Sequence, residues 1–355
     1  MVCSDVDQED PMAEEHNSRF IPHDITIEIL QHFSLRSLAI ANSVSKLWQS
    51  FVFTKSLHLH TPPSPPIRHG FFFQSSHIPK NGAPIHFFPS SPTSLTKTRF
   101  PNLRLLASSN GLLLCSKPNQ NPAIHYSVFN PSTTQLIPIP KPSNLISSVK
   151  IGFHSHDSVS FTILRFVNFG FKPMEIFASE TGEWRRLDLY FDMDTIFLPF
   201  EGPSAVVLNG VFYWLEFNSF IYAFDLLRNE FYQVGFPYEE TEYGRSVLLR
   251  CLAIAGGRLM MASTDGEVVE IRVLEDRDCL WSLKCRMRVE DVVVGINENS
   301  RRLVGIVGFD SERIYLNTTE FVICCDVGSG KVEIVYRFDT ILESTHLSNF
   351  TFFPY

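Results

Sequence analysis

Long apolar runs and a surplus of positive charge are both missing from this sequence. No apolar stretch approaches the ~20 residues that a bilayer-spanning helix needs. The 30 Lys and Arg residues are outnumbered by 38 Asp and Glu residues, which gives a formal net charge of -8. Such a balance offers no basic patch for nucleic acid or an anionic membrane. We therefore expect neither of them among the partners of this chain.

Cysteine patterning and the common catalytic motifs are also absent. The seven cysteines are odd in number and include no C-x-x-C pair, which argues against a disulfide framework or a zinc ribbon. We expect reduced thiols packed as small hydrophobes, with Cys324 and Cys325 on opposite faces of one strand. There is no G-x-S-x-G elbow and no H-E-x-x-H motif. The sequence thus predicts a protein that is not an enzyme, with no catalytic residue, no metal and no cofactor.

Three local patterns have a functional and a structural interpretation, and the structural one is favoured. Residues 328–331 read Gly-Ser-Gly-Lys, but a P-loop would need Gly and Ser or Thr where Cys325 and Val332 stand, so a hairpin turn is predicted. His154, His156 and Asp157 have the right chemistry for a metal, yet no second cluster completes a site, so an exposed turn is predicted. The third pattern is three tryptophans at comparable places in the repeat, which favour packing over ligand stacking: Trp184, Trp214 and Trp281.

The first residues of the chain are strongly acidic. Residues 1–15 contain six carboxylates and no Lys or Arg, the reverse of a secretory or mitochondrial leader. We interpret residues 1–18 as a disordered, solvated tail.

A small helical unit is predicted over residues 19–54. Pro22 and Asp24 favour the start of a first helix, and Ile25, Ile29 and Phe33 then fall on one of its faces. Two more short helices follow, each with a serine that can cap it and an apolar face: Ser37 with Leu38, Ala41 and Val44, then Ser45 with Leu47, Trp48 and Phe51. Three helices this short cannot bury all of that surface among themselves, so a partner is expected.

The order and spacing of these residues resemble an F-box. The match runs Ile21-Pro22-x-Asp24-Ile25-x-x-Glu28-Ile29-Leu30, then Ser37-Leu38, then Val44-Ser45-Lys46-x-Trp48. The resemblance implies docking on a Skp-type adaptor and, through it, on cullin and RING subunits. The implied adaptor-binding residues are Pro22, Ile25, Glu28, Ile29, Leu38, Val44, Leu47 and Trp48.

The rest of the chain reads as β structure. Residues 55–67 hold four prolines and form a stiff linker, and residues 68–355 show short apolar runs broken by turn residues. Phenylalanine, which favours strands, occurs 32 times. Similar segments begin at Asn110, Asn209, Gly256 and, more loosely, Arg301. Their spacing of about 47 residues, with a missing member near 155–160, is typical of propeller blades.

A second set of segments recurs as strands that run into a tight turn and then a further strand. Its members are Tyr126–Thr133, Ile176–Trp184, Ile221–Asp225 and Phe321–Gly330. Together with Asn110-Gly111-Leu112-Leu113-Leu114-Cys115 and Asn209-Gly210-x-x-Tyr213-Trp214, they resemble the F-box-associated, kelch-like β-propeller of plant F-box proteins. The predicted fold is mainly β: a three-helix F-box followed by a propeller of about six blades, with seven as the alternative. Residues 350–355 are expected to add a strand to the first blade and close the ring.

The resemblance implies a substrate-recognition subunit of an SCF-type (Skp–cullin–F-box) ubiquitin ligase in the cytoplasm, the nucleus or both. The F-box would bind the adaptor and the propeller a protein substrate, although no pattern identifies that substrate or the loops that bind it. One alternative is a non-ligase binding or scaffold protein with a degenerate F-box, because Phe33-Ser34, Ala39-Ile40-Ala41 and Ser45 depart from the family pattern. A propeller enzyme or a glycan-binding propeller is a third possibility, by fold analogy alone.

Overall fold

The chain divides into two compact units in a computed structural model, Met1–His60 and Thr61–Tyr355. The structure describes residue 25 of the first unit and, in the second, residues 70–75, 84–89, 102–117, 120–121, 125–143, 149–156, 160–167, 174–187, 205–215, 220–237, 249–275, 280–293, 303–318, 320–338 and 350–354. The predicted three helices, the acidic tail and the proline-rich linker lie outside these residues, apart from Ile25, which is helical. No helix among the described residues is long and apolar enough to cross a membrane.

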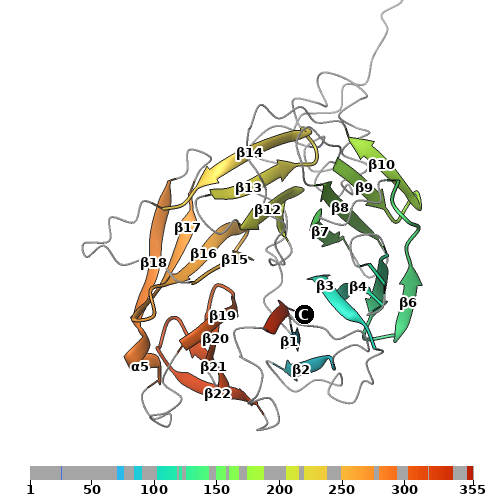
Figure 1. Cartoon of the computed structure of the whole chain (residues 1–355). Helices are drawn as coiled ribbons and strands as arrows, with labels where there is room; N and C mark the ends of the chain where they lie inside the picture. The colour runs from blue at the N-terminus through green and yellow to red at the C-terminus, as the bar shows by residue number, and fades with distance from the viewer. Residues whose placement is uncertain are drawn as a thin grey trace, which may run out of the picture. The chain divides into compact units, whose positions relative to one another are not determined.

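Six antiparallel sheets make up the described part of the second unit (Figure 1). Blade 1 has three strands, in the order β2 (His86–Pro89), β1 (Gly70–Ser75) and β23 (Phe350–Pro354). Blade 2 contains β3 (Arg104–Ser109), β4 (Leu112–Ser116), β5 (Ser127–Asn130) and β6 (Gln135–Pro138). Blade 3 contains β7 (Val149–Ser155), β8 (Phe161–Val167), β9 (Met174–Ala178) and β10 (Glu183–Leu187).

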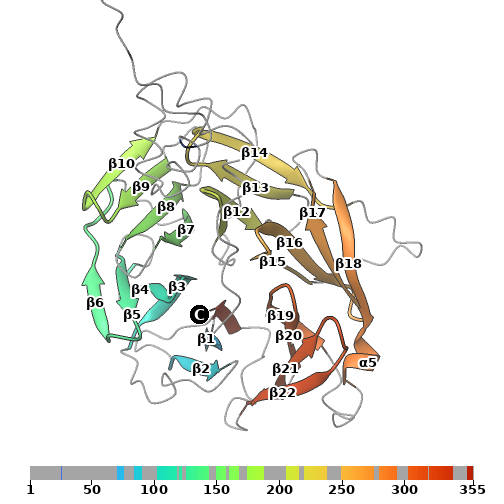
Figure 2. The same ribbon diagram turned by 180° about the vertical axis from the view of Figure 1, so that it is seen from behind.

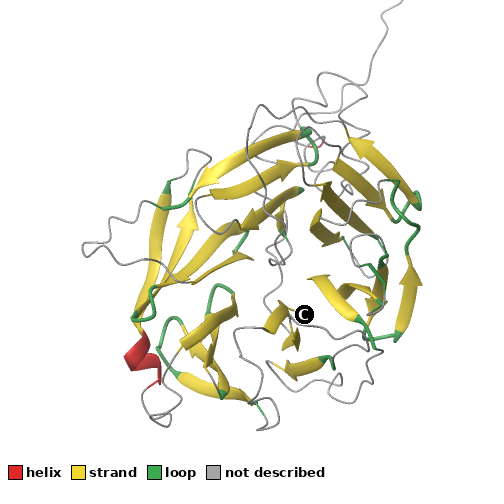
Figure 3. Cartoon of the chain, in the orientation of Figure 1, coloured by secondary structure: helices red, strands yellow, loops and turns green. Residues whose placement is uncertain are grey.

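The last three sheets follow the same four-strand plan. Blade 4 contains β11 (Val206–Leu208), β12 (Val211–Leu215), β13 (Phe220–Asp225) and β14 (Glu230–Gly235). Blade 5 contains β15 (Leu249–Ala255), β16 (Arg258–Thr264), β17 (Val268–Leu274) and β18 (Trp281–Arg288), followed by the short helix α5 (Val289–Val293), drawn in red in Figure 3. Blade 6 contains β19 (Leu303–Phe309), β20 (Arg313–Thr318), β21 (Phe321–Asp326) and β22 (Val332–Arg337).

The six sheets form a closed ring (Figures 1 and 2). The first strands of blades 2 to 6 contact one another in chain order, and β23 contacts both β19 and β3. In blade 1, β23 from the end of the chain pairs with β1 from its beginning, with Phe71 opposite Pro354 and Ser75 opposite Phe350. The predicted propeller is therefore confirmed with six blades, the seven-blade alternative is wrong, and the predicted closure by the last strand is correct.

Two-residue turns join the first two strands in three of the blades. Asn110-Gly111, Asn209-Gly210 and Gly256-Gly257 all have positive φ, from 44° to 81°. Two consecutive left-handed residues make the hairpin turn whose twist matches antiparallel strands, and Asn and Gly adopt that conformation at the lowest cost. The residues that marked the repeat in the sequence are thus the turns that create it.

The two remaining repeat markers have different outcomes. The predicted member near 155–160 is the connection between β7 and β8, as expected. Residue 301 lies outside the described residues, but the equivalent turn of blade 6 lies farther along the chain than this marker, at residues 310–312 between β19 and β20. The pairing of β19 with β20 shifts register twice, between Leu303 and Gly305 and between Ile306 and Gly308. Blade 6 therefore departs from the spacing of its neighbours.

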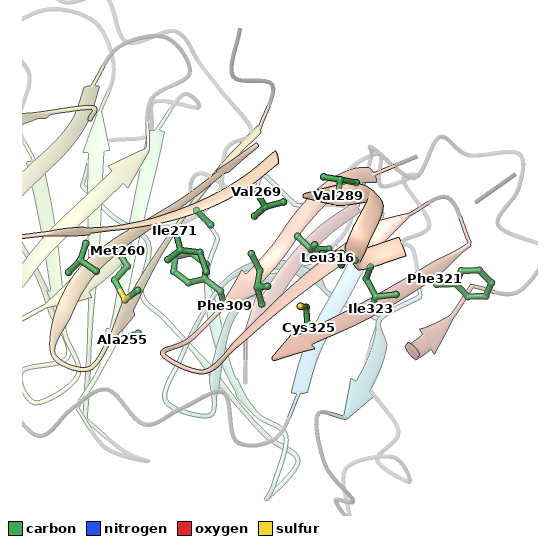
Figure 4. Packing of buried hydrophobic residues seen from close by; sticks show 14 residues of the cluster. Ala255, Met260, Val269, Ile271, Val289, Phe309, Leu316, Phe321, Ile323 and Cys325 are labelled. Carbon is green, nitrogen blue, oxygen red and sulfur yellow. The ribbon is translucent and has the colours of Figure 1, made fainter. Parts of the chain in front are cut away.

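The hydrophobic core lies between neighbouring blades, where sheets pack face to face. Figure 4 shows the cluster between blades 5 and 6, in which Met260 and Ile271 meet Phe309, Leu316 and Ile323. Another cluster, across the closure, joins three fully buried phenylalanines of blade 1 to three buried residues of blade 6: Phe71, Phe73, Phe88, Val307, Tyr315 and Val322. The abundance of phenylalanine follows from these interfaces.

The described cysteines pack into these interfaces as free thiols. Cys325 belongs to the cluster between blades 5 and 6, whereas Cys324 packs on the cluster between blades 6 and 1, so the two lie on opposite faces of β21 as predicted. Burial raises the pKa of Cys115 and of Cys251 to about 12. These thiols stay protonated and unreactive at neutral pH.

The three tryptophans connect blades, as predicted. Trp184 of β10 donates to the carbonyl of Pro140 at 2.7 Å, and Trp281 of β18 donates to that of Gly235 at 2.9 Å, so each outer strand is tied to the blade before it. Trp214 lies on β12, a second strand, and donates to Ile151 at 3.0 Å. Its position in the blade therefore differs from that of the other two.

Candidate partner-binding face of the ring

The ring has two ends that differ in how they join strands. We call "turn face" the end where first and second strands, and third and fourth strands, are connected. We call "loop face" the end that carries the connections between second and third strands and those between blades. The first described strand, β1, begins at the turn face, since Gly70 lies beside the end of β23.

Side-chain caps hold the hairpins of the turn face. Asn130 Oδ1 accepts the backbone N–H groups of Ser132 and Thr133 at 3.0 and 3.3 Å. Asp225 Oδ1 accepts two backbone N–H groups in the same way, both at 3.0 Å. Such turns satisfy their polar groups internally. They leave little conformational freedom for adapting to a partner.

Residues 328–331 belong to this set of capped turns. Asp326 accepts the N–H of Ser329 at 2.7 Å, which lowers the pKa of Asp326, and Gly330 has a φ of 70°. The segment joins β21 to β22 and does not open a helix, so the predicted hairpin is confirmed.

The loop face carries the longer connections. Successive blades are linked across residues 138–149, 187–206, 235–249, 288–303 and 337–350, counted from the end of one strand to the start of the next. Connections of this length on a rigid scaffold are where proteins usually place binding residues. The loop face is therefore the candidate partner-binding face of the ring.

A buried ion pair lies in the half of blade 3 nearer the loop face. Arg165 of β8 donates to Glu175 of β9, which is directly opposite it, and both side chains are almost completely buried. Arg165 Nε also donates to the hydroxyl of Tyr126 in blade 2 at 3.0 Å. Burial is the main cause of a rise in the pKa of Tyr126 to about 12, so it remains a neutral phenol. The arrangement locks blade 2 to blade 3 beneath the loop face.

Sequence reasoning missed this pair, although a signal was present. Arg165 stands in the apolar run 161–167, and Glu175 stands in the apolar run 174–178. One charge of each sign in two consecutive buried strands indicates a cross-strand pair, because an isolated buried charge is too costly.

The exposed turn predicted for His154, His156 and Asp157 is wrong for His154, whereas His156 lies at the bend that follows β7 and is partly buried, and residue 157 lies outside the described residues. His154 lies within the first strand of blade 3 and not in an exposed turn, with its ring 4.6 Å from that of His156 and 6.5 Å from that of Phe212. Burial, with a smaller effect of His156, lowers the pKa of His154 to about 3. Among the described residues, no three His, Cys, Asp or Glu side chains gather as a metal site would require.

The predicted adaptor-binding residues fall almost wholly outside the described part of the chain. Ile25 is helical and 48% exposed. The other seven, from Pro22 to Trp48, are not among the described residues. The adaptor-binding set therefore stays a prediction.

The closed ring, with five four-stranded sheets and one three-stranded sheet, defines a six-bladed β-propeller. The chain belongs to the family of F-box associated beta propeller domains, which it matches over residues 69–347. The resemblance of residues 68–355 to the F-box-associated β-propeller, inferred from the sequence, is thereby confirmed.

Two relatives from Arabidopsis thaliana show how far the similarity extends. Putative F-box protein At1g46984 is 26% identical over 285 residues, which cover 74% of this chain and 72% of the relative. F-box protein At5g18160 is 27% identical over 277 residues, which cover 73% and 68%. Among solved structures, a chain of the nidogen/laminin complex aligns with a TM-score of 0.41 and 12% identity, covering 80% of this chain and 98% of that one. That likeness carries no weight, and the fold rests on the strand pairing.

Proposed function

We propose that this chain is the substrate-recognition subunit of an SCF-type E3 ubiquitin ligase. The observation that carries the proposal is the F-box-like pattern of residues 20–53 placed before a propeller of the F-box-associated family. F-box proteins are also the relatives that the chain resembles over most of its length.

The F-box would bind a Skp-type adaptor by laying apolar helix faces into a groove. Ile25, Ile29, Leu38 and Trp48 are the proposed anchors. The exposure of Ile25 is compatible with this role, since an anchor must be accessible before the complex forms.

The propeller would hold the substrate protein, and the chain itself would perform no bond chemistry. Its contribution would be proximity, because a bound substrate lysine is kept at high effective concentration near a ubiquitin thioester carried by other subunits. This role requires a binding surface but no catalytic group. It would be carried out in the cytoplasm, the nucleus or both, where the adaptor and cullin act.

Co-purification of the adaptor tests the first step. We expect the full chain to retain a Skp-type adaptor, and Ile25→Asp with Ile29→Asp to abolish that retention. Ile27→Asp is the matched control, because Ile27 falls on the opposite side of the predicted helix. Retention by the double variant would refute the docking model, and no retention by the unmodified chain would favour a scaffold with a degenerate F-box.

Affinity purification with and without proteasome inhibition tests the second step. Adaptor and cullin should be present in both samples, and a further protein should be enriched only under inhibition. A further protein equally abundant in both samples would be a binding partner and not a degraded substrate.

A further inference from the structure

The outer strand of blade 2, β6, is more exposed than its counterparts in the ring. All four of its residues, Gln135–Pro138, are exposed, whereas the fourth strands of blades 3 to 6 each contain residues that are buried or partly buried. β6 lies on the rim of the ring (Figure 1), and no further described strand pairs with it. Its two large apolar side chains, Leu136 and Ile137, are 40% and 45% exposed. β6 is therefore an open, apolar edge of its sheet.

β6 also lacks the charges that the other fourth strands carry. Charged side chains on an edge strand oppose its pairing with another sheet. Such residues occur in the fourth strand of each of blades 3 to 6: Glu183, Arg185 and Arg186 in β10, Glu230 in β14, Lys284, Arg286 and Arg288 in β18, and Glu333 and Arg337 in β22. β6 reads Gln-Leu-Ile-Pro and contains none. Among these five fourth strands, the electrostatic obstacle to edge pairing is thus absent from β6 alone.

The pairing of β5 with β6 determines which backbone groups of β6 face outward. The N–H of Ile139 donates to the carbonyl of Tyr126 at 3.0 Å, so these residues form a hydrogen-bonded pair, and such pairs alternate along antiparallel strands. Leu136, opposite Phe129, and Pro138 fall at the positions in between, where the backbone groups point away from the neighbouring strand. Because proline has no N–H, Leu136 supplies the single outward N–H of β6, together with an outward carbonyl.

This edge is complementary to itself. In an antiparallel pair of two β6 strands centred on Leu136, each Leu136 donates its N–H to the carbonyl of the other, so both outward groups are satisfied. Gln135 of each strand then lies opposite Ile137 of the other, and no charge meets its like. A register that places Leu136 opposite Pro138 would leave the Leu136 carbonyl without a donor. The outward groups of β6 therefore favour one symmetric register.

We propose that two copies of this chain pair edge to edge through β6 and form a symmetric dimer centred on Leu136. The inference goes beyond the proposed function and does not depend on it. The occupant of the edge is a second copy, because one donor and one acceptor on the same residue match under a two-fold axis and the strand is uncharged. Pairing of the same edge on both copies closes the assembly at two chains. The contact is small, so the dimer is weak and forms as the concentration rises.

Sedimentation velocity of the full chain over a range of concentrations tests the dimer. The average mass should rise with concentration toward about twice that of the single chain. Leu136→Lys should abolish the rise, because it brings two ammonium groups together at the two-fold axis. The matched control is Ile334→Lys, since Ile334 is 41% exposed on β22, the fourth strand of blade 6, and this change should leave the rise intact.

A mixture of two variants tests the register. Leu136→Lys and Leu136→Glu should each remain a single chain, and their equimolar mixture should restore the dimer, because opposite charges then meet at the axis. Circular dichroism of each variant establishes that the ring is folded.

Three results would overturn the proposal. One is an unmodified chain that stays single up to its solubility limit. Another is a rise in mass that Leu136→Lys leaves unchanged, as expected if the apolar residues of the first unit cause the association. The third is a mixture of the Lys and Glu variants that fails to dimerise, which would refute the pairing of Leu136 with its own copy.

Discussion

The turn face of the ring is closed by short capped hairpins, whereas the loop face carries the longer connections between blades. At the turn face a hydrogen bond joins residues two or three positions apart, as between Asp225 and the N–H groups of residues 227 and 228. Nearer the loop face, Arg165 meets Tyr126 across 39 positions of the sequence. Contacts between blades also occur at the turn face, where Asn110 Nδ2 donates to the carbonyl of Ser155 in the next blade at 2.6 Å. The comparison teaches that local caps close the hairpins of the turn face and that a buried charge network ties two blades together nearer the loop face. Four substitutions test this difference.

The largest effect is expected from the buried ion pair. Glu175→Gln leaves the Arg165 guanidinium buried without its carboxylate, and breaking such a pair costs about 3–5 kcal/mol of unfolding free energy. The matched control is Glu275→Gln, because Glu275 pairs with Arg258 at 2.8 Å with both side chains partly exposed. That change should cost less than about 1 kcal/mol. Urea denaturation measures both, and equal losses would show that the ion pair does not secure blades 2 and 3.

A smaller loss is expected where two blades approach most closely. A Cβ added at Gly152 of β7 would lie 2.4 Å from Phe212 Cδ1 and 3.1 Å from Trp214 Cζ2 in the next blade. Gly152→Ala should therefore cost about 1–3 kcal/mol in a urea titration. Gly328→Ala is the control at the turn face, where the nearest atom is 3.6 Å away, and it should change stability by less than about 0.5 kcal/mol. An unchanged unfolding free energy for Gly152→Ala would mean that blades 3 and 4 can move apart without destabilising the fold.

His154 adds a pH dependence to the same interface. Its pKa is about 3 in the folded chain and close to 6.5 when unfolded, so the unfolded state binds more protons between these values. The part of the unfolding free energy that depends on neutral His154 is fully present above pH 6.5 and is lost as the pH falls toward 3. Lowering the pH from 6.5 to 5 should reduce the unfolding free energy of the unmodified chain by about 1.5 kcal/mol more than that of the His154→Gln variant. Parallel pH profiles of the unfolding free energy for the two proteins would contradict the burial of His154.

The smallest effect is expected from a cap of the turn face. Asp225→Ala removes the acceptor of two backbone N–H groups and should cost about 1 kcal/mol, because water can reach the partly exposed donor residues 227 and 228 even though Asp225 itself is buried. Glu230→Ala alters an exposed carboxylate at the start of the next strand and should be neutral. Thermal unfolding of both variants measures the difference. A loss for Asp225→Ala as large as that for Glu175→Gln would remove the distinction between the faces.

Local chemistry explains which parts of the fold were predictable. The Asn-Gly and Gly-Gly turns depend on their own residues, so they marked blades 2, 4 and 5 in the sequence. The marker predicted for blade 6 was misplaced in the sequence, because its first hairpin contains two shifts of register that the spacing of apolar residues does not reveal. His154 was misplaced because its burial comes from packing against blade 4, which its own neighbours in the sequence do not show.

The sequence predicts that the propeller has a binding face but not which residues lie near it. The sequence indicates a propeller with loops at one end, but the meeting of Arg165 with Glu175 beneath those loops depends on the strand register, which the sequence does not show. The adaptor-binding residues, by contrast, were inferred from spacing within a short helical segment, and they remain a prediction for the co-purification experiment.

The pairing of β1 with β23 has a consequence for how the protein is made. Residues 350–354 leave the ribosome after every other described strand, yet they form the inner strand of the blade that contains residues 70–75. Blade 1 therefore cannot be completed until residues 350–354 are made, and its phenylalanine-rich strands wait for that segment. A product that stops short of Phe350 would leave an unpaired edge on β1 at the closure, a surface prone to aggregation. Completion of the ring thus distinguishes chains that include residues 350–354 from chains that stop before them.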